Sequence, residues 1–419
     1  MTVDLGASSR ASVLRRLRSW PDLAPLAALF LISLTLRPQL IGIAPLLPDI
    51  QAEFGMSHAI AGLLGTIPVL CMGIFALPIA WVTRRFGSRN AMLGAVGAIV
   101  LFGAIRALAP GEAVLWLATV AIGIGIANAG ALLPVMVKEH FSHRPGLATG
   151  VYATTIQLGT AISAAVAVPI ALLISWRGAL LVFAVACAVL LVAWFLLQRG
   201  VTTVRHAEGT LRAVPLRSPL AWHLTGIFAI NAFCFYGLAT WLPAFFVERG
   251  WDEVAAGGAL GVLNAAGLPV GLVVPWLADR VRLRRPMLIS AAVVLVVGVL
   301  GVQLLPSTGF VWAALVGAAL GVIFPMALLL PIGALERPAD VTAILALMLG
   351  VGYSLSAAAP ALLGWVRDVS GTFSVAMWLM LPVALGMVVL TVLPMPRAGK
   401  VGGSHLEAMS DEWTQENDR

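Results

Sequence analysis

The chain has 419 residues, of which 60% are hydrophobic and only 11% are charged, and its mean hydropathy is +0.98. About a quarter of the residues of a soluble domain are charged, so this composition excludes a soluble protein. The net charge of +7 does not indicate a nucleic-acid-binding protein, because the positive residues are spread over short loops between apolar segments.

Apolar runs of about 20 residues or more, long enough to cross a bilayer, follow one another along the whole chain. They predict an all-α integral membrane protein with twelve transmembrane helices, and no cleavable signal peptide at the polar, basic N-terminus. Cys71, Cys187 and Cys234 fall inside these runs and are expected to be free core residues. The predicted spans cover residues 22–50, 57–82, 91–109, 112–138, 146–174, 178–198, 220–248, 253–278, 286–305, 308–335, 340–367 and 372–394.

The first span carries an arginine in its middle, at Arg37 in the run LISLTLRPQLIGIAPLLPDI. Its distance from Asp22 and from Asp49 is about 18–22 Å along a helix, close to the bilayer midplane. Pro38 has no N–H and removes the helical donor for the carbonyl of Leu34, so the helix is expected to kink there. All 19 acidic residues fall at span ends, in loops or in tails. Arg37 is therefore predicted to line a water-filled cavity and to bind one anion, with hydrogen bonds to freed backbone carbonyls as the alternative.

A second arginine, Arg106, lies three residues before the end of the third span. A long basic side chain at this depth is expected to reach the membrane interface, so Arg106 is predicted to snorkel. Two basic loops, TRRFGSRN and ADRVRLRR, follow the second and eighth spans. They are predicted to form cytoplasmic salt bridges that gate the protein, or only to fix its topology. The candidate gating residues are Arg84, Arg85, Arg89, Asp279 and Arg280.

Few other polar side chains lie within the spans, and these are candidates for contact with a small solute. Each amide is at least as well explained by a hydrogen bond between helices, and the aromatic Trp241 by plain packing. With Arg37, the candidate substrate-binding residues are Asn128, Tyr152, Gln157, Tyr236, Trp241, Asn264 and Tyr353.

The two halves of the chain repeat each other at an offset of 195 residues. Pro48 corresponds to Pro243 and Gly55 to Gly250, and the two basic loops fall opposite each other. Two six-helix halves indicate a transporter whose solute site lies between them near the midplane. The predicted parts are a cytoplasmic segment 1–21, an N-terminal bundle 22–198, a linker 199–219, a C-terminal bundle 220–394 and a disordered cytoplasmic tail 395–419.

The distribution of basic residues predicts the orientation. With both termini in the cytoplasm, 21 of the 26 Lys and Arg residues lie on the cytoplasmic side and 4 lie outside, with Arg37 within the membrane. This bias is the positive-inside rule, and it predicts a multi-pass protein of a bacterial inner membrane with both termini inside.

Four stretches carry a resemblance: LRPQLIGIAPLLPDI, FYGLATWLPAFFVERG, GLPVGLVVPWLADR and GYSLSAAAPALLGWVRDVSGTF. Along its whole length the chain resembles the major facilitator superfamily, and within it the cyanate and 2-nitroimidazole permeases. The resemblance implies two pseudo-symmetric bundles and a cavity lined by spans 1, 4, 7 and 10. The chain departs from the superfamily's usual pattern at Arg84, where an aspartate is expected. It departs from the branch at Asn231-Ala232, where a Gln-Ser pair is expected, and at Leu349, where a glutamine is expected.

Together these features predict a secondary active or facilitative transporter that takes up a small monoanionic organic or cyanate-like solute by alternating access. The alternatives are an exporter of a neutral, nitroimidazole-like compound and, more remotely, a membrane receptor without transport. An enzyme is not expected, because the six histidines lie at span ends, in loops or in the tail. No cofactor, metal or nucleic acid is expected. The predicted partners are the solute, the lipid bilayer and a coupled proton or counter-ion, and the protein is predicted to be a monomer.

Overall fold

The computed structural model describes residues 20–75, 79–141, 145–197, 216–281, 284–335 and 337–396, and every regular element in these ranges is helical. The predicted N-terminal segment, linker and tail therefore lie almost wholly outside the described residues. The elements are α2 (Trp20–Leu34), α3 (Pro38–Ile41), the 3-10 turn η1 (Ala44–Leu46), α4 (Leu47–Phe54), α5 (His58–Phe75), α6 (Ile79–Phe86), α7 (Ser88–Ala107), α8 (Glu112–His140), α9 (Pro145–Leu197), α10 (Pro219–Glu248), α11 (Glu253–Val281), α12 (Arg284–Leu304), the 3-10 turn η2 (Pro306–Thr308), α13 (Gly309–Ala334), α14 (Pro338–Ser356), α15 (Ala358–Ser370), α16 (Phe373–Trp378) and α17 (Met380–Val392).

Within the described ranges, 11 segments are long and apolar enough to cross a membrane. One of them, Leu147–Leu197, has 51 residues, which is about 77 Å of helix and more than twice the thickness of the hydrocarbon core. It is interrupted at Ser175, where φ is 82°. The segment is therefore the predicted fifth and sixth spans joined by a tight turn, and the number of crossings agrees with the predicted twelve.

The turn at Ser175 is held by contacts to the ends of earlier helices. Trp176 Nε1 donates to Glu53 at 2.8 Å, and Arg177 Nη2 donates to the same carboxylate at 2.5 Å. Arg177 Nη1 also donates to the carbonyls of Ala107 and Ala109, at 3.1 and 2.8 Å. These bonds tie the turn to the ends of α4 and α7 and stabilise a backbone conformation that a serine rarely adopts.

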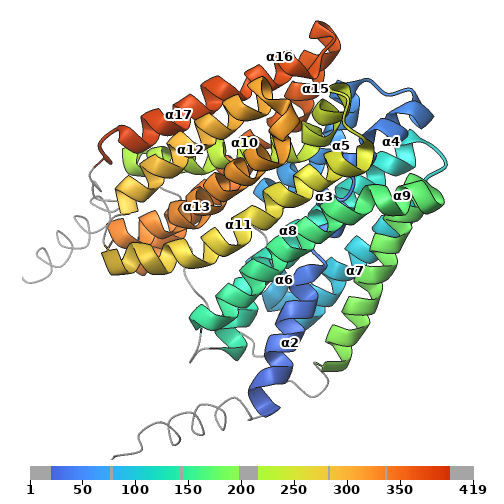
Figure 1. Cartoon of the computed structure of the whole chain (residues 1–419). Coiled ribbons are helices and arrows are strands. Elements are labelled where there is room, and N and C mark those ends of the chain that lie inside the picture. Colours follow the sequence, from blue (N-terminus) through green and yellow to red (C-terminus); the bar gives the residue numbers. More distant parts are fainter. Residues whose placement is uncertain are drawn as a thin grey trace, which may run out of the picture.

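The helices form two groups that meet at one end of the molecule. In the first group α2 and α7 pack on α9, and α7 packs on α8; in the second, α11 packs on α13, α10 on α14, and α12 on α13 and α17. The main contacts between the groups are α5 with α15 and α14, and α9 with α11. In Figure 1 the groups lie side by side near α4, α5 and α15 and diverge away from that end.

Glycines permit the closest approach between the two groups. A Cβ on Gly62 of α5 would lie 2.5 Å from the carbonyl oxygen of Pro360, and one on Gly364 of α15 would lie 2.2 Å from that of His58. Both distances are far below van der Waals contact, so these positions accept only glycine at this helix spacing. We call the region formed by residues 58–62 and 360–368 the sealed end.

The internal repeat is visible in backbone conformation as well as in sequence. Gly55 follows α4 with φ of +66°, and Gly250, 195 residues later, follows α10 with φ of +87°. Gly62 and Gly257 share the same offset, and both face the other half: a Cβ on Gly257 would lie 3.2 Å from Val168 of α9. Equivalent glycines therefore end equivalent helices and make equivalent contacts between the halves.

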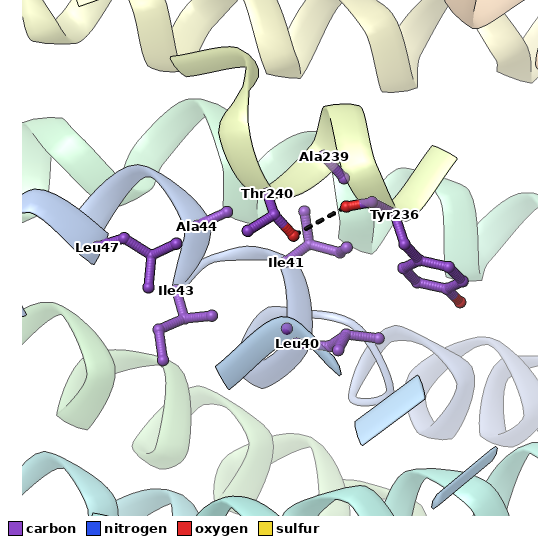
Figure 2. A pocket seen from close by; sticks show the side chains of 9 residues that line it. Leu40, Ile41, Ile43, Ala44, Leu47, Tyr236, Ala239 and Thr240 are labelled. Carbon is purple, nitrogen blue, oxygen red and sulfur yellow. Dashed lines mark hydrogen bonds between the residues drawn. The ribbon is translucent and has the colours of Figure 1, made fainter. Parts of the chain in front are cut away.

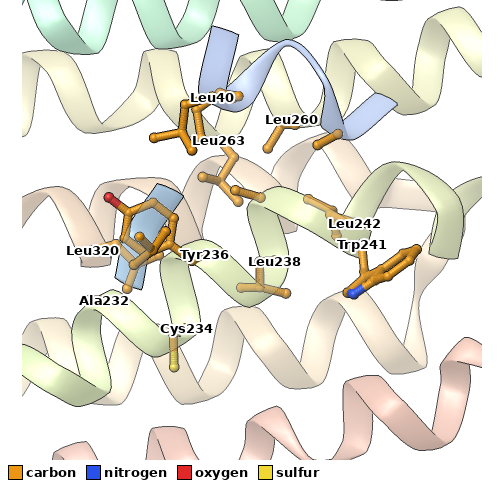
Figure 3. Packing of buried hydrophobic residues seen from close by; sticks show 14 of the residues in the cluster. Leu40, Ala232, Cys234, Tyr236, Leu238, Trp241, Leu242, Leu260, Leu263 and Leu320 are labelled. Atoms are coloured by element: carbon orange, nitrogen blue, oxygen red, sulfur yellow. The ribbon is translucent and has the colours of Figure 1, made fainter. Parts of the chain in front are cut away.

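The core is centred on α10, which is buried along most of its length. Trp241, Leu242 and Leu238 are almost fully buried there and belong to the same apolar cluster as Leu260 and Leu263 of α11 and Leu320 of α13 (Figure 3). The three cysteines are buried and free, as the sequence predicts.

The structure contradicts the prediction that Arg106 snorkels. The side chain is 0% exposed, and Nη2 donates to both the main-chain carbonyl and the side-chain oxygen of Gln39, at 2.5 and 2.7 Å. The prediction counted residues from the helix end, but the side chain is on the face of α7 that packs against the broken part of span 1. Arg106 therefore turns into the protein instead of toward the interface.

Candidate functional site

The site begins with the break in span 1 that Pro38 predicts. Helix α2 ends at Leu34, and a new turn, α3, begins at Pro38 with Arg37 as its N-cap residue. The N–H groups of Leu40 and Ile41 both donate to the carbonyl of Arg37, at 3.0 and 2.9 Å. The predicted kink is confirmed, and it is a full interruption: α3, η1 and α4 follow one another as short separate turns.

Arg37 makes a hydrogen bond across the two halves of the protein. Its Nη1 donates to the hydroxyl of Tyr236 on α10 at 3.2 Å, and the arginine side chain is only partly buried. The Tyr236 hydroxyl in turn lies 3.8 Å from the sulfur of Met72 on α5. Two of the predicted site residues, 199 positions apart, are thus in direct contact.

An aromatic group surrounds this contact. The ring of Tyr353 on α14 lies edge-on to that of Tyr236, with centroids 6.3 Å apart. Phe228 packs edge-on to Tyr353 at 5.1 Å, and Phe235 packs edge-on to Tyr236 at 5.1 Å. We call Arg37, Tyr236 and Tyr353 the central site. Its rings offer flat apolar faces and two hydroxyl groups beside one guanidinium.

The charge of Arg37 has no carboxylate partner among the described side chains. The close contacts between basic and acidic side chains in the described residues join His58 to Asp368, His140 to Glu139 and Arg177 to Glu53. A guanidinium has five N–H donors, and the bond to Tyr236 uses one of them. The remaining donors and the uncompensated charge suit a small anion that displaces or joins the tyrosine hydroxyl.

A narrow pocket adjoins the central site on the side of the sealed end. It lies between the broken segment of span 1 and α10, and Thr240 lines it beside Tyr236 (Figure 2). Leu40, Ile41 and Ala44 form the opposite wall, so the lining is mostly apolar. The Thr240 hydroxyl donates to the Tyr236 carbonyl at 2.8 Å and is therefore occupied within its own helix.

The other predicted polar residues lie on separate helices. Asn264 of α11 is 1% exposed; its amide donates to Leu260 at 2.8 Å and its carbonyl oxygen is without a partner. Asn128 of α8 also has an oxygen without a partner. Gln157 of α9 approaches α11, with Nε2 3.8 Å from where a Cβ on Gly267 would be. Among the hydrogen bonds of the described residues, none joins these amides to Arg37.

Trp241 and Tyr152 are placed differently from the central site. The Trp241 indole is 0% exposed and donates to the carbonyl of Pro360 at 2.6 Å. It lies toward the sealed end, away from the Tyr236 ring (Figure 3). Tyr152 packs against the apolar cluster of the first half.

The candidate gating residues are only partly described. Arg85 is exposed, and Arg89 places its guanidinium 5.0 Å from the centre of the Phe195 ring. The side chains of Arg84, Asp279 and Arg280 lie outside the described residues. The predicted salt bridges between the two basic loops therefore remain a prediction.

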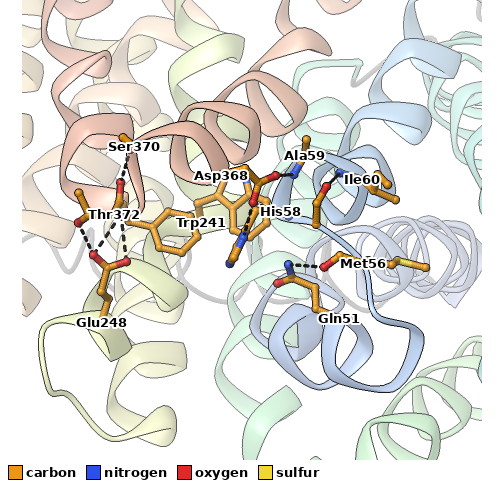
Figure 4. A network of polar contacts seen from close by, with 12 residues as sticks. Gln51, Met56, His58, Ala59, Ile60, Trp241, Glu248, Asp368, Ser370 and Thr372 are labelled. Carbon is orange, nitrogen blue, oxygen red and sulfur yellow. Dashed lines mark hydrogen bonds and ion pairs between the residues drawn. The ribbon is translucent and has the colours of Figure 1, made fainter.

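The sealed end holds a polar contact between the halves that the sequence does not reveal. Asp368 of α15 accepts hydrogen bonds from the main-chain N–H groups of His58 and Ala59, at 3.0 and 2.8 Å, and lies 2.7 Å from His58 Nδ1 (Figure 4). The carboxylate thus caps the first turn of α5. The rings of Trp241 and Phe373 pack around His58 with centroids 5.8 and 5.4 Å away. The only sequence signal is that the spans place His58 and Asp368 at the same side of the membrane.

Comparisons with known proteins agree with this architecture. The family model of the Major Facilitator Superfamily matches residues 25–357. The chain is 34% identical over 375 residues to the 2-nitroimidazole transporter of Escherichia coli (strain K12), covering 88% of this chain and 92% of that protein. It is 30% identical over 351 residues to the cyanate transport protein CynX of the same organism, covering 83% and 91%.

Among solved structures, the fold is similar to a bacterial homolog of the human lysosomal transporter Spinster. The TM-score is 0.72 at 16% sequence identity, and the match covers 90% of this chain and 94% of that chain.

Proposed function

The chain belongs to the major facilitator superfamily, as a secondary transporter and not an enzyme, and we propose that it takes up a small organic or cyanate-like solute carrying one negative charge. The solute binds at the central site and crosses the membrane by alternating access. The observation that carries the proposal is the bond between Arg37 and Tyr236, in which an unpaired positive charge of one half meets a hydroxyl of the other.

The charge of the solute follows from the electrostatics of the central site. A guanidinium kept inside the membrane is costly unless water or an anion stabilises it. With one positive charge and no described carboxylate paired to it, a monoanion gives a neutral loaded site, whereas a cation would be repelled. The planar fork of Arg37 matches a carboxylate, a cyanate or a nitro group, and the edge-on rings favour a flat solute.

Alternating access is supported by where the halves touch. The contacts between α5 and α15 close one end, and the Arg37–Tyr236 bond lies between the halves. The positive-inside distribution assigns the sealed end to the outside. In this assignment the structure is closed to the outside, and the solute leaves the central site toward the cytoplasm.

A second candidate is export of a neutral, nitroimidazole-like compound. It is favoured by the 34% identity to a protein named as a 2-nitroimidazole transporter and by the aromatic group around Tyr353. The two candidates require different properties of Arg37. Binding of an anion requires its positive charge, whereas binding of a neutral nitro compound requires only hydrogen-bond donors.

The test is a thermal-shift titration of purified wild type, Arg37→Gln and, as a control for net charge, Arg217→Gln at an exposed position. The probes are cyanate, nitrate, benzoate and 2-nitroimidazole. The proposal expects one of the anions to raise the melting temperature of wild type and Arg217→Gln with concentration, and to leave folded Arg37→Gln unchanged. A response of all three proteins to 2-nitroimidazole alone would favour the second candidate.

Flux then separates transport from binding. Sealed vesicles containing the wild type are expected to accumulate the radiolabelled anion that gives the shift, with Arg37→Gln at the level of empty vesicles. Binding without flux in either direction would support the receptor alternative instead.

A further inference from the structure

The buried pair Arg106 and Gln39 lies directly behind the break in span 1. Arg106 is in the last turn of α7, and Gln39 is the second residue of α3, two positions after Arg37. Both side chains are 0% exposed. The pair is distinct from the central site, because the hydrogen bonds of Arg106 go to Gln39 and that of Arg37 goes to Tyr236.

The break leaves the main-chain carbonyl of Gln39 without its helical hydrogen-bond donor. A continuing helix would supply the N–H of Ile43, four residues on, but α3 ends at Ile41, and the main-chain hydrogen bonds of the described break include none from Ile43 to Gln39. Arg106 Nη2 occupies that place at 2.5 Å. The same nitrogen holds the Gln39 side-chain oxygen at 2.7 Å, so one arginine fixes both the backbone and the side chain.

Gln39 is held from two further directions. Its Nε2 donates to the carbonyl of Leu180 on α9 at 3.1 Å. On α7, a Cβ at Gly103 would lie 2.7 Å from the same Nε2, so the absence of a side chain there makes room for the glutamine. The Gln39 side chain thus attaches the turn α3 to α7 and α9 of the first half.

Only one of the three guanidinium nitrogens of Arg106 has a hydrogen-bond partner among the described residues. Its Nε and Nη1 have no hydrogen-bond partner, and the ion pairs of the described side chains do not include it. A buried unpaired charge is unfavourable, and an apolar side chain of similar length would avoid that cost. A role in stability alone therefore explains Arg106 poorly.

We propose that Arg106 is a positioning residue, which acts through Gln39 to fix the orientation of α3 and thereby aims Arg37 at Tyr236. Arg37 caps the turn that contains Gln39, so a rotation of that turn moves the Arg37 guanidinium away from the other half. This inference rests on the proposed function only for its consequence, the affinity of the central site for an anion.

The test measures how accessible the Arg37 guanidinium is to a chemical reagent in protein without solute. Phenylglyoxal modifies accessible arginines, and peptide mass spectrometry gives the rate at Arg37 in detergent-purified protein. The variants are Gln39→Leu, Arg106→Met and their double substitution, with Tyr236→Phe as the reference for a broken bond. The matched control is Gln303→Leu, which removes another buried glutamine that donates to a carbonyl, that of Ser374 at 2.8 Å in the second half.

Gln39→Leu and Arg106→Met are expected to change the Arg37 rate in the same direction as Tyr236→Phe, by a factor of about three or more, as for residues in direct contact. The effects of the two single substitutions should not add in the double variant, because both remove the bond between Arg106 and the Gln39 side chain. Gln303→Leu should match the wild type. The proposal is overturned if folded Arg106→Met keeps the wild-type rate, or if both single variants fail to fold while Gln303→Leu folds.

The two proposals fail separately. If no anion shifts the melting temperature of the wild type, the proposed function fails, and the phenylglyoxal rates still decide whether Arg106 positions Arg37. If an anion does bind, Arg106→Met is expected to raise its dissociation constant about ten-fold without a matching loss of melting temperature. Loss of melting temperature with unchanged affinity would contradict the positioning role.

Discussion

Replacing Asp368 by asparagine is expected to open the sealed end. In the structure one carboxylate oxygen accepts the main-chain N–H of His58 and contacts its ring nitrogen, and the other accepts the N–H of Ala59. These bonds join α15 to α5, which belong to different halves. The amide of asparagine keeps one acceptor oxygen and has no charge, so it loses part of the cap and weakens the contact with the His58 ring.

The size of the effect follows from the same contacts. A carboxylate cap at a helix N-terminus stabilises by about 0.5–2 kcal/mol. The His58 contact adds no more than about 1 kcal/mol, because the two side chains are 23% and 24% exposed. A net loss of about 1–2 kcal/mol changes the ratio of closed to open molecules by a factor of about 5–30.

The ratio of closed to open molecules is measured by labelling a cysteine that the sealed end covers. Thr240 is 6% exposed and lines the pocket next to Tyr236, so Thr240→Cys reports opening. A membrane-impermeant maleimide is added to vesicles from the side of the sealed end, and the parent chain gives the background from the native buried cysteines. Adding Asp368→Asn should raise the labelling rate by about 5–30 times.

Asp252→Asn is the matched control. Asp252 accepts the N–H of Ala255 at 2.9 Å and caps α11 within the second half, so its loss should not change the contact between halves. Equal labelling of the Asp368 and Asp252 variants would refute the view that the Asp368 cap holds the sealed end together.

Three further outcomes follow from single sites. Arg37→Lys keeps the charge and loses the planar fork, so thermal-shift titration should give an anion response about ten-fold weaker than wild type; a response equal to wild type would show that charge alone suffices. Gly317→Ala places a Cβ 1.8 Å from the Leu263 carbonyl oxygen, which should lower the unfolding free energy by about 1–3 kcal/mol; an unchanged melting temperature would contradict the close packing of α11 on α13. Gln39→Glu gives Arg106 a carboxylate partner and should stabilise by about 1–2 kcal/mol, measured as a higher melting temperature; a lower one would mean that the bond to Leu180 matters more.

Local chemistry made part of this structure predictable from the sequence. The missing N–H of Pro38 predicts the break after Leu34, and the structure has it. The 195-residue repeat predicts that Gly55 and Gly250 play the same part, and both adopt positive φ at the end of a helix. Such features depend on a residue and its neighbours in the chain, so the sequence contains them directly.

Contacts between distant residues were not predictable in the same way. His58 and Asp368 are 310 positions apart, and nothing near either residue indicates its partner. The prediction for Arg106 was wrong because its side chain bonds to Gln39, and that contact depends on how α7 and span 1 lie relative to each other. Tyr236 and Tyr353 were both candidates for their hydroxyl groups, and the sequence did not indicate that the described hydrogen bond of Arg37 goes to Tyr236.

The turn at Ser175 has a consequence for the order in which the chain is assembled. Glu53, Ala107 and Ala109, which hold Trp176 and Arg177, all precede the turn in the sequence. A membrane protein is synthesised from its N-terminus, so the first and third spans are made before the unfavourable conformation of Ser175 has to form. The residues that hold the turn are therefore already synthesised when the fifth and sixth spans are made, and a chain that lacked the first span would have to close this turn without Glu53.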